Sequence, residues 1–352
     1  MNGATLRNRV TDLVGIDVPI VQTGMGWVSD ARLTAATSSA GGLGILSAAL
    51  LSFEELAEAI SRIQHMTDRP FGVNVRADQA DVVERIDLMV RAGVRVASFA
   101  LAPKADLIKR CKDGGLVVIP SIGAARHAEK VAGWGADAVI VQGGEGGGHT
   151  GPVPTTLLLP SVVDAVDIPV IAAGGFFDGR GLVAALAYGA EAVAMGTRFL
   201  LTQESPVADA VKAVYLGASL TDTVVTTQVD GVPQRVLRRG TIAELEGATS
   251  VGRLARAGRN ALAFRKLTGT PLPEMMREGM ALHHGQDRTW SQVVMAANAP
   301  MLYKAALHDG RADVGVMATG QVVGMIDDIP TVADLIARIM EQAHTTLERL
   351  PR

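Results

Sequence analysis

The sequence predicts a closed (β/α)8 barrel that is followed by a smaller, mostly helical segment. Short apolar runs recur up to residue 200, and amphipathic helical patterns lie between them. Each run is nearly continuous rather than alternating, which is typical of parallel strands covered on both faces. Alternating strands and helices predict a parallel sheet, and eight such units are the number that closes a barrel. An open, doubly wound parallel sheet is the alternative.

The expected elements follow in chain order. Glycine often stands just after the helical patterns, where a left-handed C-cap residue is needed. The clearest helical patterns cover 53–64, 80–93, 124–136 and 178–190, and the expected strands cover 18–23, 43–47, 71–75, 94–100, 116–121, 137–142, 168–175 and 191–196.

Beyond residue 200 this rhythm stops. We expect three units: a barrel over 1–230, a mostly helical cap over 231–310, and a C-terminal segment over 311–352 that returns to the barrel. From residue 235 to 288 there are ten Lys or Arg and five Asp or Glu, an excess of five positive charges. A solvated helical face accounts for such a run. Alternatively, Arg256 and Arg259 bind the phosphates of a substrate, since Arg makes bidentate phosphate contacts.

Composition narrows the protein class. The chain has 352 residues, 48% of them hydrophobic, which is ample for a large core. A net charge of −3 gives no indication of nucleic-acid binding. The single cysteine, Cys111, excludes an internal disulfide. With neither a signal peptide nor an apolar run of membrane-spanning length, a cytoplasmic protein without a membrane partner is expected, and an oligomer is compatible with these data.

Polar residues and glycines gather where the expected strands end, which is where barrels of this class carry their functional groups. They are TGMG (23–26), Asn74, Ser121, Gln142, AAGG (172–175) and MGTRF (195–199). The glycine-rich loops after the seventh and eighth strands suit a phosphate, because glycine lets backbone N–H groups approach an anion closely. With amide side chains nearby, the pattern favours flavin mononucleotide (FMN), although another phosphorylated ligand fits it too.

Residues 142–151, QGGEGGGHTG, form a third glycine-rich stretch, here called the glycine loop. Gly146, Gly148 and Gly151 match the GxGxxG spacing, but a dinucleotide-binding turn follows the first strand and opens a helix directly. This stretch follows the sixth strand and runs into two prolines. We therefore expect a loop whose backbone approaches a ligand and carries His149 to it.

These residues resemble the nitronate monooxygenase (2-nitropropane dioxygenase) family of FMN-dependent barrels. The ordered series VPIVQTGMGW, AGGLGIL, PFGVNVR, QGGEGGGHTGP, PVIAAGGFFDGRG, MGTRFLLTQES and ATGQVVGMIDDIP carries the resemblance over essentially the whole chain. It implies FMN, with NAD(P) as a candidate co-substrate, and a catalytic histidine at His149. By motif match, the implied cofactor-binding residues are Thr23, Gly24, Met25, Asn74, Gln142, Gly147, Gly148, Ala173, Gly174, Gly175, Gly196, Thr197 and Gln321.

Within the family, VQTGMGW, QGGEGGGHTG and WSQVVMAAN resemble a narrower branch. Its members act on CoA thioesters of the two-ring hydrindane fragment in bacterial sterol degradation. That resemblance implies a CoA thioester substrate and hydride transfer through flavin N5. Nitronate oxidation with O2 and flavin-dependent enoyl-thioester reduction are the enzymatic alternatives, and a flavin-binding module without catalysis is an alternative of another class.

Two further expectations concern single side chains. An imidazole near neutral pH suits proton transfer, so His149 is the catalytic candidate, while a merely loop-pinning role is the alternative. Glu145 is expected to order the loop rather than to act as a base. His283 and His284 have no Asp, Glu or Cys partner at ligand spacing, and a metal site is not predicted.

Overall fold

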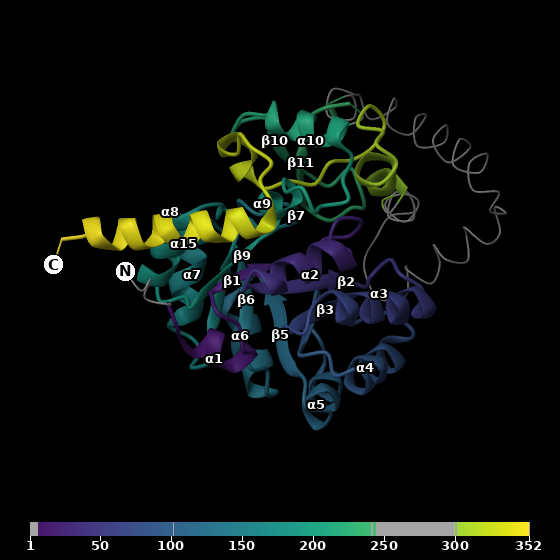
Figure 1. Cartoon of the computed structure of the whole chain (residues 1–352), viewed down its shortest axis with the longest axis vertical. Helices are drawn as coiled ribbons and strands as arrows, with labels where there is room; N and C mark the ends of the chain where they lie inside the picture. Colours follow the sequence, from purple (N-terminus) through teal and green to yellow (C-terminus); the bar gives the residue numbers. More distant parts are fainter. Residues whose placement is uncertain (1–5, 101, 241, 244–298, 300, 352) are drawn as a thin grey trace.

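The computed structural model describes residues 6–100, 102–240, 242–243, 299 and 301–351. Eight parallel strands close into a barrel (Figure 1), which confirms the predicted fold class and excludes the open sheet, because the first strand pairs with the last. In barrel order the strands are β1 (Ile20–Gln22), β2 (Leu43–Ser47), β3 (Phe71–Val75), β4 (Val96–Phe99), β5 (Val117–Ile122), β6 (Val139–Gln142), β8 (Val170–Ala173) and β9 (Ala192–Met195).

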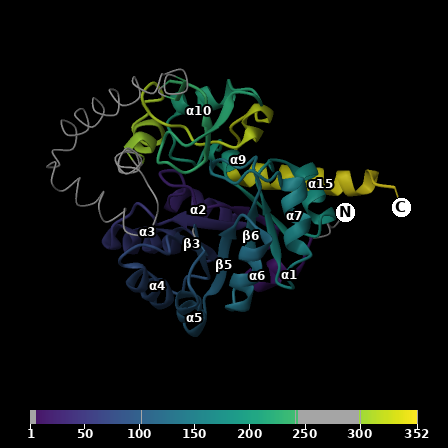
Figure 2. The ribbon, with the colours of Figure 1, turned by 180° about the vertical axis from the view of Figure 1, so that it is seen from behind.

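Seven helices connect successive strands, and the C-terminal helix α15 (Val332–Arg349) completes the outer ring. It packs against the first and last of these helices, and Figure 2 shows it from behind, running out to the C-terminus. Only the four-residue helix α9 (Thr197–Leu200) follows β9 directly. A Cβ atom at Gly179 would lie 2.4 Å from Ala343 N, so α15 requires glycine there. The connecting helices are α2 (Ala31–Ser39), α3 (Phe53–Met66), α4 (Val82–Arg91), α5 (Ala105–Asp113), α6 (Ala125–Gly133), α7 (Thr155–Val163) and α8 (Gly179–Ala187).

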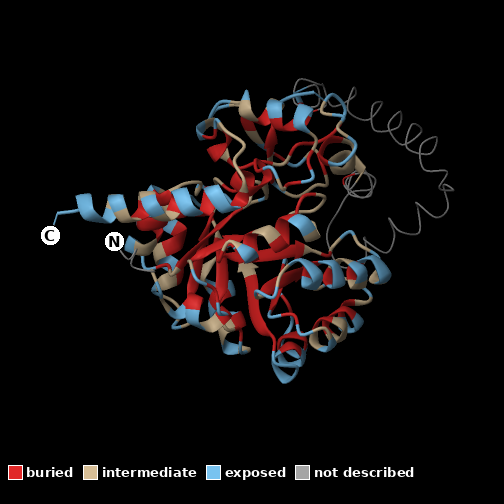
Figure 3. Cartoon of the chain, in the orientation of Figure 1, coloured by how far each residue is buried: buried red, intermediate tan, exposed pale blue. Residues whose placement is uncertain are grey.

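Two apolar layers hold the barrel together. One fills its interior, and the other lies between strands and helices, as the red strands and inner helix faces of Figure 3 show. Helix α1 (Arg9–Val14) contributes Val10 and Val14 to the interior cluster. This helix is held at its start by a capping box from Asn8 and at its end by Gly15 with φ of 87°. The sequence analysis did not predict α1.

A second, three-stranded antiparallel sheet lies beyond the barrel (Figure 1). It consists of β10 (Thr223–Thr226), β11 (Gln234–Leu237) and the two-residue β7 (Gly148–His149), in the order β10-β11-β7. It has a small core of its own, with Val229, Val236 and Val316 among its members. Strand β11 falls in the range expected to be mostly helical. The expected division at residue 230 falls in the turn that joins two paired strands.

Further short elements follow the barrel, among them a helical stretch over residues 301–307. Helices α9 (Thr197–Leu200) and α10 (Asp209–Leu216) follow the barrel, and the 3-10 helix η1 (Gln321–Met325) precedes α15. Within the ranges that the structure describes, no helix has the length and apolarity needed to cross a membrane.

Candidate active site

A cavity of about 440 Å³ opens at the carboxyl ends of the barrel strands. Asn74, Ser121 and Gln142, which stand last or second last in three different strands, all line it. Every residue predicted to bind the cofactor lines it too, except Gln321, whose backbone N–H instead donates to Glu145 O at 3.0 Å. The volume lies in the range of cofactor and substrate pockets. The barrel therefore brings the strand-end residues to one site, as predicted.

Backbone forms much of the cavity wall. A Cβ atom at Gly147 would lie 2.5 Å from the carbonyl carbon of Thr319, and one at Gly24 would lie 2.6 Å from Asn74 Cβ. Gly174 and Gly175 have φ of 91° and 86°, a region that side chains disfavour. These positions require glycine and leave backbone at the cavity surface. Such a cradle fits a flat, phosphorylated ligand of the kind the family resemblance implies.

Glu145 orders the glycine loop. Its carboxylate accepts hydrogen bonds from Thr155 N at 2.9 Å and Thr155 Oγ1 at 2.7 Å. Thr155 is the first residue of α7, whose N-cap residue Pro154 provides no side-chain cap. Glu145 therefore caps the helix from a distance, with its negative charge at the positive end of the helix dipole. This geometry supports the loop-ordering role over that of a base.

Two side chains, one within the glycine loop and one on β11, hold the backbone of the loop. Gln142 Nε2 donates to His149 O at 2.8 Å, and Arg235 donates from Nη2 to Gly144 O at 2.8 Å. Arg235 stands on β11, which pairs directly with Gly148 and His149. Its guanidinium is partly buried, and this burial lowers the pKa of Arg235. One arginine of the basic run thus has a structural partner in the loop.

His149 pairs with an aspartate that the sequence analysis missed. Its Nε2 lies 2.7 Å from Asp230 Oδ2, and the Asp230 side chain is only 14% exposed against 61% for His149. Burial opposes ionisation of Asp230. However, the hydrogen bond and charge of His149, together with Val232 N–H and the Gln234 amide, outweigh burial and lower the pKa of Asp230. Asp230 is therefore a carboxylate at neutral pH.

Gln234 and Tyr303 form the cavity wall next to this pair. Gln234 is 1% exposed, and its Oε1 accepts a hydrogen bond from the Tyr303 hydroxyl. Burial and the nearby Asp230 charge raise the pKa of Tyr303, so the phenol keeps its proton and donates. Among the described residues, Gln234 Nε2 has no hydrogen-bond partner.

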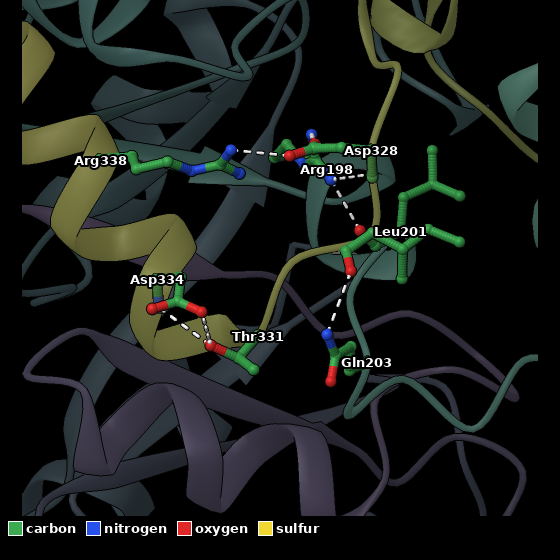
Figure 4. A network of polar contacts seen from close by, with 8 residues as sticks. Arg198, Leu201, Gln203, Asp328, Thr331, Asp334 and Arg338 are labelled. Atoms are coloured by element: carbon green, nitrogen blue, oxygen red, sulfur yellow. Dashed lines mark hydrogen bonds and ion pairs between the residues drawn. The ribbon is translucent and has the colours of Figure 1, made fainter.

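The C-terminal segment that precedes α15 closes the cavity from a third side. Gly320 N donates to Thr197 Oγ1 at 2.9 Å, and both residues line the cavity. Figure 4 shows what anchors this segment: Asp328 accepts hydrogen bonds from Arg198 Nη1 at 2.9 Å and from Arg338 Nη1 at 2.7 Å. Arg198 is 4% exposed and also donates to Leu201 O. Helices α9 and α15 therefore hold the segment against the barrel.

Asp230, Gln234 and Tyr303 were not predicted, although the sequence held a signal for the first two. Asp230-Gly231 lies between TVVTTQV and QRVL, and Asp-Gly between β-rich runs predicts a hairpin. Gly231 has φ of 86°, as such a turn requires. Arg256, Arg259, His283 and His284 lie outside the described residues. Within the described part of the chain, no cluster of three or more His, Cys, Asp or Glu could hold a metal ion.

Comparison with known proteins agrees with this geometry. A sequence model described as nitronate monooxygenase matches residues 7–88 and 80–342. Among solved structures, FabK from Thermotoga maritima superposes with a TM-score of 0.77 at 35% identity, covering 97% of this chain and 98% of that one.

Two curated relatives match nearly the whole chain. Both are named (3aS,4S,5R,7aS)-5-hydroxy-7a-methyl-1-oxo-octahydro-1H-indene-4-carboxyl-CoA dehydrogenase. The relative from Mycobacterium tuberculosis is 61% identical and covers 97% of this chain and 98% of its own length. The one from Rhodococcus jostii is 59% identical and covers 99% and 98%, respectively.

Proposed function

Because the chain belongs to the nitronate monooxygenase family, we propose that it dehydrogenates a cyclic CoA thioester with a hydrindane skeleton in steroid catabolism, using FMN. Membership makes it a flavin-dependent oxidoreductase; FMN as the flavin and the thioester as substrate belong to the proposal. The observation that carries the proposal is the His149–Asp230 pair at the edge of a cavity with a glycine-built wall. The two relatives named for such a thioester support the substrate class.

The glycines divide the cofactor site into two parts. Gly174, Gly175 and Gly196 follow β8 and β9, where barrels commonly bind phosphate through backbone N–H groups, so we assign the FMN phosphate to them. Asn74, Gln142 and Gly147 line the rest of the cavity and would bind the ring system. When bound, FMN supplies the two-electron redox chemistry, and the protein supplies orientation and electrostatics.

Asp230 determines which nitrogen of His149 exchanges a proton. A carboxylate only accepts hydrogen bonds, so a neutral imidazole that bonds to Asp230 through Nε2 carries its proton on that nitrogen. Nδ1 is then left with its lone pair, ready to take a proton from a ligand. Asp230 also stabilises the imidazolium that forms when it does so. We assign proton transfer to Nδ1 of His149 and positioning to Asp230.

We propose that the CoA part of the substrate binds to the positively charged stretch of residues 235–288. Arg256 and Arg259 remain our proposal for its phosphates, on charge alone. Reversing both charges should raise the KM for a CoA thioester while leaving the visible absorbance spectrum of the bound flavin unchanged. An unchanged KM would remove these two arginines from the proposal.

The proposed function is tested by anaerobic titration of the purified protein. A 5-hydroxy-hydrindane carboxyl-CoA thioester is expected to bleach the visible flavin band, because a dehydrogenated substrate leaves its electrons on the flavin. Propyl nitronate and NAD(P)H are added in parallel samples. Bleaching by propyl nitronate and not by the thioester would favour nitronate oxidation, and bleaching by NAD(P)H would identify a nicotinamide co-substrate. Colourless protein that does not take up added FMN would contradict the flavin proposal altogether.

A further inference from the structure

Gln234 Nε2 is a buried donor that needs a partner. The residue is 1% exposed and lines the cavity, and no described residue accepts a hydrogen bond from this nitrogen. Leaving a buried donor unpaired is costly, and native proteins rarely do so without a bound ligand or water. The position of Gln234 on the cavity wall indicates that a ligand atom accepts the hydrogen bond from its Nε2.

The orientation of the amide follows from its two neighbours. The Tyr303 phenol keeps its proton and donates to Oε1, which identifies Oε1 as the acceptor side of the amide. The amide also contributes to the low pKa of Asp230, as expected of a donor that faces a carboxylate. A flipped amide would turn its oxygen towards that negative charge. Nε2 therefore faces the Asp230 side, without reaching hydrogen-bond geometry there.

A donor and a carboxylate side by side select for one kind of ligand group. A carbonyl oxygen could accept from Gln234 Nε2 but would be repelled by the Asp230 carboxylate. A hydroxyl group satisfies both neighbours, because its oxygen accepts from the amide while its proton is donated to the carboxylate. Asp230 has lone pairs to spare, since Oδ2 accepts a hydrogen bond from His149 Nε2 and Oδ1 accepts one from Val232 N.

We propose that Gln234 and Asp230 together bind a ring hydroxyl group of the substrate, with Gln234 as the specificity-determining residue. The assignment rests on the proposed function, and the hydroxyl in the names of both curated relatives is consistent with it. Tyr303 acts through Gln234 by holding Oε1. This hydroxyl lies next to the Asp230–His149 pair, so its binding places the ring of the substrate beside the catalytic imidazole.

The test compares two hydrindane carboxyl-CoA thioesters that differ only in the ring hydroxyl. Their dissociation constants and kcat/KM values are measured for the wild type, for Gln234→Met, and for the surface control Gln64→Leu, whose amide donates to Ala92 O on the outside of the barrel. Methionine matches glutamine in length and removes the donor. Flavin content and Tm are recorded for every variant.

The wild type is expected to bind the hydroxylated thioester about 10- to 100-fold more tightly than the deoxy thioester. Gln234→Met should reduce that preference to about 2-fold or less, with deoxy binding unchanged, and Gln64→Leu should keep it. Tyr303→Phe, which frees Oε1, should reduce the preference to an intermediate value. This second variant decides the question if Gln234→Met does not fold.

Three results would overturn the inference. Equal wild-type affinity for the two thioesters would exclude a hydroxyl-binding pair. An equal loss of affinity for both thioesters in Gln234→Met would show a structural role alone. Absence of binding by either thioester to the flavin-loaded wild type would instead overturn the proposed function and this inference with it. The flavin bleaching by the deoxy thioester separates the last case from the first two.

Discussion

The two halves of the cavity wall are built in different ways. The barrel half consists largely of backbone, with glycines such as Gly147 and Gly174 where a side chain would collide or strain the chain. The half that comes from β10, β11 and their turn consists of side chains: Asp230, Gln234 and, packed against them, Tyr303. The first suits a cofactor common to many family members, and the second suits a particular substrate. His149 stands between them, because β7 belongs to the glycine loop and pairs with β11.

Removing the imidazole should have the largest effect, because it affects proton transfer and leaves the cofactor half intact. His149→Ala is expected to lower kcat for the CoA thioester by about 10²- to 10⁴-fold, the usual contribution of a general acid or base. Flavin content should stay at the wild-type level, since His149 is largely exposed and its backbone is held by Gln142. Steady-state kinetics and the visible spectrum measure the two quantities. Unchanged turnover with flavin retained would leave His149 a loop-pinning role only.

Adding a single methyl group to the backbone-built half should instead weaken flavin binding. In Gly147→Ala the new Cβ atom would lie 2.5 Å from Thr319 C and 2.6 Å from Gly320 N, both backbone atoms that cannot rotate away. Overpacking of this kind costs about 1–3 kcal/mol, so flavin affinity should fall by about 5- to 150-fold.

The matched control for this variant is Gly123→Ala. Gly123 follows β5 at the same end of the barrel, and nothing lies within 4 Å of its Cβ position. Flavin affinity should be unchanged there. Equal effects of the two substitutions, measured by flavin fluorescence titration, would contradict a cradle that depends on the close approach of backbone.

Replacing Asp230 should have a smaller effect on turnover than removing His149. Asp230→Asn keeps an acceptor for His149 but removes its charge, and a charge-assisted hydrogen bond exceeds a neutral one by roughly 1 kcal/mol. We therefore expect kcat for the deoxy thioester to fall about 5- to 10-fold with KM unchanged, since that substrate makes no contact through a ring hydroxyl. Asp230→Glu should recover part of the loss. A change confined to KM would contradict positioning through His149.

The contrast between the two halves also explains what could be predicted from the sequence. The strands of the barrel bury both faces, so each reads as an apolar run, and β2 and β3 match the expected 43–47 and 71–75 to the residue. Barrel geometry then brings Asn74, Gln142 and Gly196 together, because each lies at the carboxyl end of a strand or follows one directly. This placement depends on local sequence and on a regular fold.

The second half could not be predicted in this way. In this half, Gln234 pairs with His149, although the two residues are 85 positions apart in the sequence. The pairing is antiparallel and involves β7, which is only two residues long and therefore shows no periodic pattern in the sequence. Tyr303 reaches the same wall from another part of the chain. The arginines that were predicted there, Arg256 and Arg259, lie outside the described residues and remain predictions, as do the domain boundaries.

Glu145 offers a test of the loop between the halves, with an effect on stability rather than on chemistry. Glu145→Ala removes the remote cap of α7 and leaves Thr155 N–H without its acceptor, which should lower the free energy of unfolding by about 1–2 kcal/mol. Glu145→Gln keeps one oxygen and should lose less. Because neither variant removes a group assigned to proton transfer, kcat should change by less than about 3-fold. A loss of kcat comparable with that of His149→Ala would assign Glu145 to catalysis instead.

The smallest expected effect belongs to Arg338, which does not line the cavity. Burial opposes ionisation of Asp328, but hydrogen bonds from Arg338 and Arg198 outweigh it and lower the pKa of Asp328. A lowered carboxyl pKa stabilises the fold above the pKa of the unfolded chain, and this stabilisation disappears as the pH falls through the folded pKa.

Arg338→Ala should therefore lower the free energy of unfolding by about 0.2–1 kcal/mol at pH 7, because Asp328 and Arg338 are both well exposed. The difference from wild type should be constant down to about pH 5 and should disappear as the pH falls through the lowered pKa of Asp328 in the folded protein. Urea denaturation over this pH range measures it, with Arg62→Ala in the more exposed Glu58 pair as the control. A difference that persists in strong acid would mean that Arg338 stabilises α15 by packing rather than through the charge of Asp328.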